Sequence, residues 1–270
     1  IAGRAVKDVH DSFEIMTVRS LVGFLLVLAI GGLTGQLGKI STARLSGHAL
    51  RNVVHFTGQN LWFWSLGMIP LAQVFALEFT SPLWVILLAP LVLGEGLTAR
   101  KATAAGLGFV GILIVARPDF SQLDPGVLAA AGSAVAFATT TLLTKRLTRG
   151  ETVIGILFWL TLFQFFFGLA TAGWDGDIAL PTAETWPWLV LIGFCGVLAH
   201  FSLTSALSLA PASFVVPIDF VRLPLIAVVG ALAYEEPLDP YVLIGGTLIF
   251  GGIWLNLRGE LKSRNSATGQ

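Results

Sequence analysis

Long apolar runs recur along the whole chain, and they constrain the fold more than any other feature. A helix needs about 20 apolar residues to cross the roughly 30 Å of hydrocarbon in a bilayer. Runs of this kind, bounded by turn-forming or charged residues, predict nine membrane spans, at residues 13–33, 49–67, 71–93, 99–116, 125–147, 152–173, 187–209, 213–234 and 240–258. The sequence therefore predicts an all-α protein that crosses the membrane several times.

The composition supports this interpretation and disfavours other classes. Of the 270 residues, 55% are hydrophobic and 12% are charged, whereas a soluble domain usually has about 25% charged residues. The formal net charge of zero gives no indication of a nucleic-acid partner. The chain has neither an HExxH motif nor a Walker A motif, so we expect no bound metal, no cofactor and no transport driven by ATP.

Lysine and arginine gather in alternate loops, and this asymmetry orients the chain. If the loop at 34–48 is cytoplasmic, the cytoplasmic side holds Lys39, Arg44, Arg51, Arg100, Lys101, Lys145, Arg146, Arg149, Arg258, Lys262 and Arg264. The opposite side then holds only Arg4, Lys7 and Arg117. The bias predicts a cytoplasmic C-terminus, and the polar residues 260–270 are expected to form a disordered cytoplasmic tail.

Two distant segments of the chain are similar enough to indicate an internal duplication. The stretch "PLAQVFALEFTSPLW", which starts at Pro70, aligns without gaps with "PASFVVPIDFVRLPL", which starts at Pro211. In this alignment Glu78 corresponds to Asp219, and the similarity continues into the following helix of each copy. A repeat of this length predicts that the fold consists of two related halves.

The two halves are expected to be inverted relative to each other in the membrane. We place them at residues 1–118 and 119–259, and the odd number of spans in each repeat puts equivalent loops on opposite sides. The span at 125–147 has its counterpart upstream of Ile1, so this chain is expected to lack most of the first of five helices in its first half. Inverted repeats with a central cavity between the halves are typical of secondary transporters.

Several motifs carry a resemblance to a known family. They are "FEIMTVRSLVGFLLV", "PLWVILLAPLVLGEGLT", "ATAAGLGFVGILIV" and "EEPLDPYVLIGGTLIFGGI". With them the chain resembles the EamA-type ten-helix carriers of the drug/metabolite transporter superfamily, and within that branch it looks most like the YddG-type amino-acid exporters. The resemblance implies a carrier in the bacterial inner membrane that exports aromatic and other neutral amino acids by alternating access.

Other functions remain open at this point. A carrier or exporter of another small metabolite or drug, such as a nucleoside, a sugar or a cationic compound, fits the same features. A membrane-embedded enzyme fits less well because clustered catalytic residues are not evident, so we expect no enzymatic activity. A purely structural protein would not need charges inside its spans. We expect a small-molecule substrate and the lipid bilayer as partners, and a monomer or a weak homodimer.

Ionisable residues inside the predicted spans are the first candidates for a substrate site, because each costs about 2.5–3.5 kcal/mol at mid-membrane. Asp219 and Arg222 are three residues apart on one helix face and are expected to pair. Either the pair only holds the fold, or Arg222 binds a substrate carboxylate while Asp219 orients it or meets an ammonium group. Glu78 is expected to pair with Arg19 or Arg222, or to meet a substrate amine.

Further candidates lie on the helix that precedes each of these segments. Gln59 corresponds to His200 in the repeat, and His55, Gln59 and Trp62 share one helix face. They form either a substrate-binding stripe or a set of hydrogen bonds between helices, and His200 is also a possible proton site. Trp62 and Phe79 are candidates for aromatic contacts in the cavity.

Prolines fall in the same two charged segments. Pro82, Pro217 and Pro224 each remove a backbone hydrogen bond and are expected to kink their helices. Such kinks predict hinges for gating, although a kink that serves only the fold is the alternative.

One motif is misleading. The sequence "GLGFVG" at 106–111 matches the dinucleotide-binding pattern G-x-G-x-x-G, but it lies inside an apolar helix and does not follow a strand. Together with "GGTLIFGG" at 245–252, it is expected to let helices pack closely, and these faces could also support a dimer.

Overall fold

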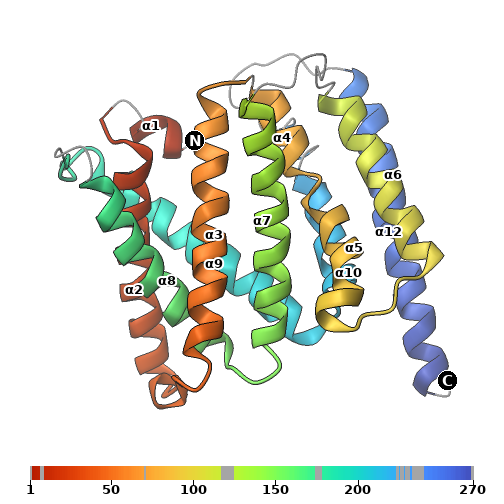
Figure 1. Cartoon of the computed structure of the whole chain (residues 1–270), viewed down its shortest axis with the longest axis horizontal. Coiled ribbons are helices and arrows are strands. Elements are labelled where there is room, and N and C mark those ends of the chain that lie inside the picture. The colour runs from red at the N-terminus through yellow and green to blue at the C-terminus, as the bar shows by residue number, and fades with distance from the viewer. Residues whose placement is uncertain are drawn as a thin grey trace. The chain divides into compact units, whose positions relative to one another are not determined.

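The protein is built from helices. A computed structural model describes residues 2–6, 9–69, 71–116, 125–173, 178–222, 225, 228, 232 and 240–268, and these residues contain no strand. The elements are α1 (Ala2–Val6), α2 (Ser12–Leu33), η1 (Leu37–Lys39), α3 (Leu45–Leu66), α4 (Leu71–Glu78), α5 (Ser81–Leu93), α6 (Ala99–Ala116), α7 (Pro125–Leu147), α8 (Val153–Ala172), α9 (Trp186–Leu209), α10 (Ala212–Val215), η2 (Val216–Val221) and α12 (Pro240–Thr268) (Figure 1). The all-helical prediction is confirmed.

Four of the described helices, α2, α7, α8 and α9, are long and apolar enough to cross a membrane. Helix α9 carries large apolar side chains that are exposed in the folded chain, among them Phe194, Leu198 and Phe201. Such side chains are unfavourable in water and are accommodated by lipid. The chain is therefore a polytopic helical membrane protein, as the sequence predicts.

The chain divides into two compact units that do not follow the predicted repeats. Unit 1 contains residues 1–56 and 143–209, and unit 2 contains residues 57–142 and 210–270. Each unit therefore takes residues from both halves of the sequence, and α3 and α7 each contribute to both units. The boundaries predicted for the repeats, at 1–118 and 119–259, remain a prediction about the sequence duplication.

In unit 1, α2 packs against α8 and α9. Its core contains the buried side chains of Val27, Ile154 and Leu157. Helices α2 and α9 approach closely at Gly193, where an added Cβ would lie 2.7 Å from Cβ of Val22. A glycine at this position brings the two backbones near enough for the polar residues of α2 and α9 to share one pocket.

Helix α2 begins with a capping box. The backbone N–H of Glu14 donates to Oδ1 of Asp11 at 2.7 Å, and the backbone N–H of Asp11 donates to Oε2 of Glu14 at 3.0 Å. The Glu14 carboxylate also accepts from the backbone N–H of Ala179 and lies 3.3 Å from Nδ1 of His10. This acidic residue at the start of a predicted span therefore stabilises the helix terminus and the loop beside it.

In unit 2, α6 and α12 lie side by side (Figure 1). An added Cβ on Gly111 would lie 2.6 Å from the carbonyl oxygen of Gly245, and one on Gly252 would lie 2.6 Å from that of Ala104. Neither position has room for a methyl group. The expectation that the glycine patterns of these helices allow close packing is confirmed.

Helix α12 is longer than the predicted span at its C-terminal end. It continues through Thr268, so residues 260–268, which the sequence predicts to be disordered, are helical in the structure. No glycine or proline interrupts this stretch, and residues such as Leu261 and Lys262 favour helix. A polar composition was therefore insufficient to predict disorder here.

The predicted span at 71–93 is interrupted. Helix α4 ends at Glu78 and α5 begins at Ser81, so the helical structure is interrupted at Phe79 and Thr80. Pro82 lies in the first turn of α5, where a missing N–H leaves no helical hydrogen bond unmade. The sequence predicts a kink at Pro82. In the structure the helix is instead interrupted at Phe79–Thr80, and Pro82 lies at the start of the second helix.

The predicted span at 213–234 is also irregular where it is described. The short helix α10 leads directly into the 3₁₀-helix η2, and Pro217 occupies the first turn of η2. Pro224 lies outside the described residues. Irregular backbone at membrane depth is tolerated where protein or a polar cavity satisfies its hydrogen-bonding groups.

The start of α10 is held by the loop that follows α5. The Glu95 carboxylate accepts from the backbone N–H groups of Ala212 at 2.8 Å and Ser213 at 3.1 Å, and from Oγ of Ser213 at 2.7 Å. Nζ of Lys101 also donates to Oγ of Ser213 at 2.8 Å. These bonds fix the beginning of the irregular segment that carries Asp219 and Arg222.

Candidate functional site

Five of the candidate residues meet in unit 2, in a group that we call the acid–arginine cluster: Trp62, Glu78, Phe79, Asp219 and Arg222. Nη2 of Arg222 donates to Oε1 of Glu78 at 2.9 Å and lies 3.4 Å from Oδ2 of Asp219. Nε1 of Trp62 donates to Oε2 of Glu78 at 2.8 Å. The guanidinium carbon of Arg222 lies 4.9 Å from the ring centroid of Phe79, within range of a cation–π interaction.

The two irregular segments bring this cluster together. Glu78 is the last residue of α4, and Arg222 directly follows η2. The neighbouring residues Phe79 and Phe220 are 1% exposed and belong to one apolar core with Ile112 of α6. Because these aromatic anchors fix the backbone on each side, the charged side chains are held at short range although their sequence positions are distant.

The cluster is only partly shielded from its surroundings. The side chains of Arg222 and Asp219 are 45% and 55% exposed, whereas that of Glu78 is 15% exposed. Arg222 has five N–H donors, and the described contacts leave room for further hydrogen bonds from its guanidinium. One cation, two carboxylates and aromatic rings are therefore available at a single accessible position.

Gln59 lies on α3, one turn before Trp62. Its side chain is 8% exposed, and its Oε1 atom has no hydrogen-bond partner among the described residues. A buried amide oxygen in this state costs free energy unless a ligand, a water molecule or another group satisfies it. Gln59 belongs to unit 2, like the cluster.

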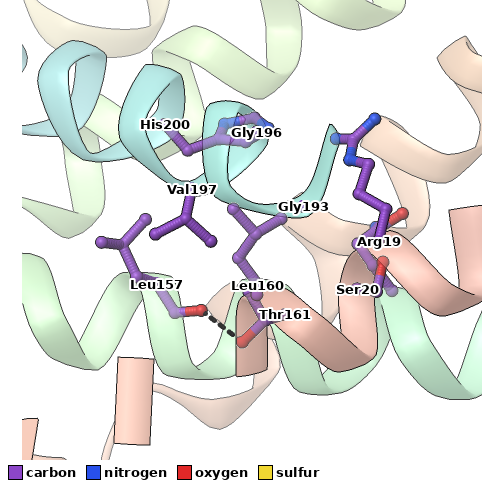
Figure 2. Close-up of a pocket in the computed structure, with 11 residues that line it drawn as sticks. Arg19, Ser20, Leu157, Leu160, Thr161, Gly193, Gly196, Val197 and His200 are labelled. Carbon is purple, nitrogen blue, oxygen red and sulfur yellow. Dashed lines mark hydrogen bonds between the residues drawn. The ribbon is translucent and has the colours of Figure 1, made fainter. Parts of the chain in front are cut away.

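His200 belongs to unit 1, whereas Gln59 and the acid–arginine cluster belong to unit 2. Its ring stands edge-on to that of His55, with centroids 5.4 Å apart and an interplanar angle of 83°. It also lines a pocket of about 20 Å³ with a mixed polar and apolar lining, which we call the polar pocket after its side chains Arg19, Ser20, Thr161, Gln164 and His200. This volume is enough for about one water molecule. Figure 2 shows this pocket between α2, α8 and α9, with Arg19 and Ser20 on α2 and Thr161 on α8.

Unit 1 contains a further group of polar side chains whose contacts the sequence did not predict. We call it the amide network: Arg51, Asn52, Thr144 and Gln164. Arg51 donates from Nε to Oγ1 of Thr144 at 3.1 Å and from Nη1 to Oδ1 of Asn52 at 3.1 Å. Nε2 of Gln164, which also lines the polar pocket, donates to the carbonyl oxygen of Asn52 at 3.2 Å.

Arg51 is buried within unit 1. It is one of the charges that the sequence predicts on the cytoplasmic side, and its side chain is 3% exposed. The signal that could have revealed it is the polar pair Arg51–Asn52 early in α3, together with the single amide of Gln164 in the apolar run of α8.

The sequence profile of the EamA-like transporter family matches residues 1–117 and 124–258. The chain belongs to the EamA-like transporter family. Membership agrees with the family resemblance carried by the sequence motifs, and it makes the protein a secondary transporter of small molecules rather than an enzyme.

Named relatives of this EamA-family chain differ in substrate. A riboflavin transporter of Rhizobium johnstonii is 32% identical over 217 residues, which cover 80% of this chain and 71% of the relative. An S-adenosylmethionine uptake transporter of Rickettsia bellii is 24% identical over 254 residues, which cover 93% and 86%. These names give no support to the amino-acid specificity that the closer resemblance implied.

The fold also has a solved counterpart. A crystal structure with 16% sequence identity superposes with a TM-score of 0.79 and covers 94% of this chain and 91% of that chain. At this identity the comparison establishes a shared fold and leaves the substrate to chemical argument.

Proposed function

We propose that this EamA-family protein carries a small metabolite with a flat aromatic ring system across the bacterial inner membrane, and that riboflavin is the first substrate to test. The acid–arginine cluster is the observation that carries the proposal. Substrate pockets combine aromatic walls with a few polar groups that fix orientation, and this cluster offers both. The riboflavin transporters among the relatives support the choice of ring system.

The chemistry of the cluster suits such a ligand. Trp62 and Phe79 provide faces or edges for an aromatic ring. The guanidinium of Arg222 can donate to the carbonyl oxygens of a heteroaromatic ring, while the carboxylates of Glu78 and Asp219 can accept from its N–H groups or from hydroxyl groups of a side chain. Trp62 and Arg222 together orient Glu78, so the acceptor is preorganised.

Amino-acid export is a second candidate, and one observation favours it. Arg222 places a cation within 2.9 Å of Glu78 and 3.4 Å of Asp219, and a zwitterion needs both signs of charge close together. In this alternative, Arg222 binds the carboxylate of the amino acid and one of the acids binds its ammonium group.

The interrupted segments provide the moving parts in this proposal. Short breaks such as Phe79–Thr80 between α4 and α5 can absorb the backbone changes of alternating access. Pro82 and Pro217, each in the first turn of an element, would keep these breaks in place. We also propose that the C-terminus is cytoplasmic, as the lysine and arginine bias predicts.

Flux into liposomes tests the proposal. Purified protein is reconstituted, and uptake of radiolabelled riboflavin, S-adenosylmethionine and a panel of amino acids is measured with and without a pH gradient. We expect saturable riboflavin flux that falls at least tenfold in Arg222→Ala and is unchanged in Arg100→Gln, an exposed arginine on α6 outside the cluster. Flux of amino acids without riboflavin would favour the second candidate, and flux of neither would refute both.

A further inference from the structure

Three arginines line a cavity of about 600 Å³ in unit 1, and none of them belongs to the cluster, the network or the polar pocket described above. Arg44 directly precedes α3, Arg146 lies in the last turn of α7, and Arg149 follows that helix. The guanidinium of Arg44 rests against Gly150, where an added Cβ would lie 2.7 Å from Nη1. The start of α3 and the end of α7 thus gather three cations around one space.

Two of the three arginines of this cavity lack an acidic partner in the described part of the chain. No carboxylate of the described residues lies within ion-pair distance of Arg44 or Arg146. All three arginine side chains are exposed. Like charges held together in this way raise the local potential and attract an anion with several acceptor oxygens.

The cavity also has apolar walls. Leu50, Leu143 and Leu147 line it together with the arginines, and Leu50 is 54% exposed. Helix α7 is one of those able to cross a membrane, so the cavity lies where a membrane span ends. A ligand that fits here has an anionic oxygen-rich group and an apolar part that continues along the helices.

We propose that this cavity, the arginine pocket, binds the phosphate group of an anionic phospholipid. Guanidinium groups bind phosphate oxygens in pairs, and basic pockets at the ends of membrane helices accept anionic lipid headgroups. Ser46 and Gly47, in the first turn of α3, line the same cavity and add the positive end of that helix to the arginines. The leucines receive the glycerol and the first acyl carbons.

The test compares lipids on the full-length chain. Purified protein in mild detergent receives phosphatidylglycerol, phosphatidylcholine or inorganic phosphate, and bound lipid is counted by native mass spectrometry while thermal unfolding is followed in parallel. We expect phosphatidylglycerol, and neither of the other two, to bind and to raise the unfolding temperature. In Arg44→Gln/Arg146→Gln the affinity for phosphatidylglycerol should fall at least tenfold.

Two variants separate the site from general surface charge and from misfolding. Lys39→Gln/Arg100→Gln removes two exposed cations predicted on the same membrane side and should bind as the parent chain does. Arg44→Lys/Arg146→Lys keeps the charge and should retain part of the binding, which shows that the pocket still folds. Equal losses in both Gln variants, or a full response to inorganic phosphate alone, would overturn the proposal.

Discussion

Two of the polar groups in the described part of the chain differ in the environment of their arginine. In the acid–arginine cluster of unit 2, Arg222 pairs with the two carboxylates of Glu78 and Asp219, and its side chain remains 45% exposed. In the amide network of unit 1, Arg51 is 3% exposed and its described hydrogen bonds go to the neutral side chains of Thr144 and Asn52. A partly exposed group that contains charges of both signs can exchange partners, whereas a buried cation requires fixed acceptors.

The two groups also differ in the free-energy cost of losing a hydrogen-bond or ion-pair partner. A buried charge is tolerated only when hydrogen bonds saturate it, so losing one acceptor leaves a large penalty. A partly exposed ion pair contributes little to stability because solvent competes with it. We infer that the amide network mainly holds unit 1 together and that the acid–arginine cluster mainly serves binding. The following predictions test this division, beginning with the largest effect.

Asn52→Leu should cause the greatest loss of stability. Asn52 accepts from Arg51 and Gln164, and its Nδ2 donates to the carbonyl oxygen of His48 at 2.9 Å, so the change leaves several buried groups unpaired. We expect the free energy of unfolding to fall by about 3 kcal/mol, measured by denaturant titration in mixed micelles. Thr171→Val, which removes a hydroxyl bonded only within α8, is the control. A loss no larger than that of the control would contradict a structural role for the network.

Arg222→Gln and Glu78→Gln should separate binding from stability. Each single variant should lower substrate flux at least tenfold, and the free energy of unfolding should change by about 1 kcal/mol or less because the pair is partly exposed. A double-mutant cycle in liposomes and micelles measures both quantities on the same proteins. A loss of stability as large as that of Asn52→Leu, with substrate flux retained, would contradict the proposal that the acid–arginine cluster mainly serves binding.

Trp62→Phe should have a smaller effect on binding. The change keeps an aromatic ring but removes the donor that lies 2.8 Å from Oε2 of Glu78. Since Arg222 still orients that carboxylate, we expect the apparent substrate affinity to weaken by about fivefold, which corresponds to roughly 1 kcal/mol. Trp64→Phe, at a neighbouring tryptophan that is 54% exposed, should leave the affinity unchanged. Identical results for both tryptophans would remove Trp62 from the site.

Asp219→Asn should have the smallest effect on stability. Its carboxylate is 55% exposed and lies 3.4 Å from Nη2 of Arg222, so the free energy of unfolding should change by less than about 0.5 kcal/mol. The change should instead alter the relative flux of cationic and neutral substrates, because it removes one of two negative charges beside the binding groups. A constant ratio of these fluxes would show that Glu78 alone provides the acidic partner.

Much of the helical framework could be predicted because hydropathy and helix-breaking residues fix it. Helices α6 and α7 have the bounds predicted at 99–116 and 125–147. The break at Phe79–Thr80 was not predicted, because the surrounding run is uniformly apolar and Pro82 fits a kink as well as a helix start. Local spacing cannot distinguish these two backbones.

The candidate residues could be predicted from the free-energy cost of charges in a membrane span and from the internal sequence repeat. Glu78, Asp219 and Arg222 were found because charges are rare in apolar spans, and the repeat also places Glu78 and Asp219 at equivalent positions. The ion pair between Glu78 and Arg222 was one of the partnerships expected, and the structure contains it. His200 was grouped with the other candidates through the same symmetry, yet it lies in unit 1, because a sequence repeat does not decide which compact unit a residue joins.

The glycine contacts between α6 and α12 limit how a transport cycle can proceed. A Cβ at Gly111 or Gly252 would lie 2.6 Å from a facing carbonyl oxygen, so the two backbones are in close contact at these glycines. We expect helices α6 and α12 to move as a rigid pair within unit 2. The backbone would then bend at other positions during opening and closing, such as Phe79–Thr80, where continuous helical hydrogen bonds are already absent.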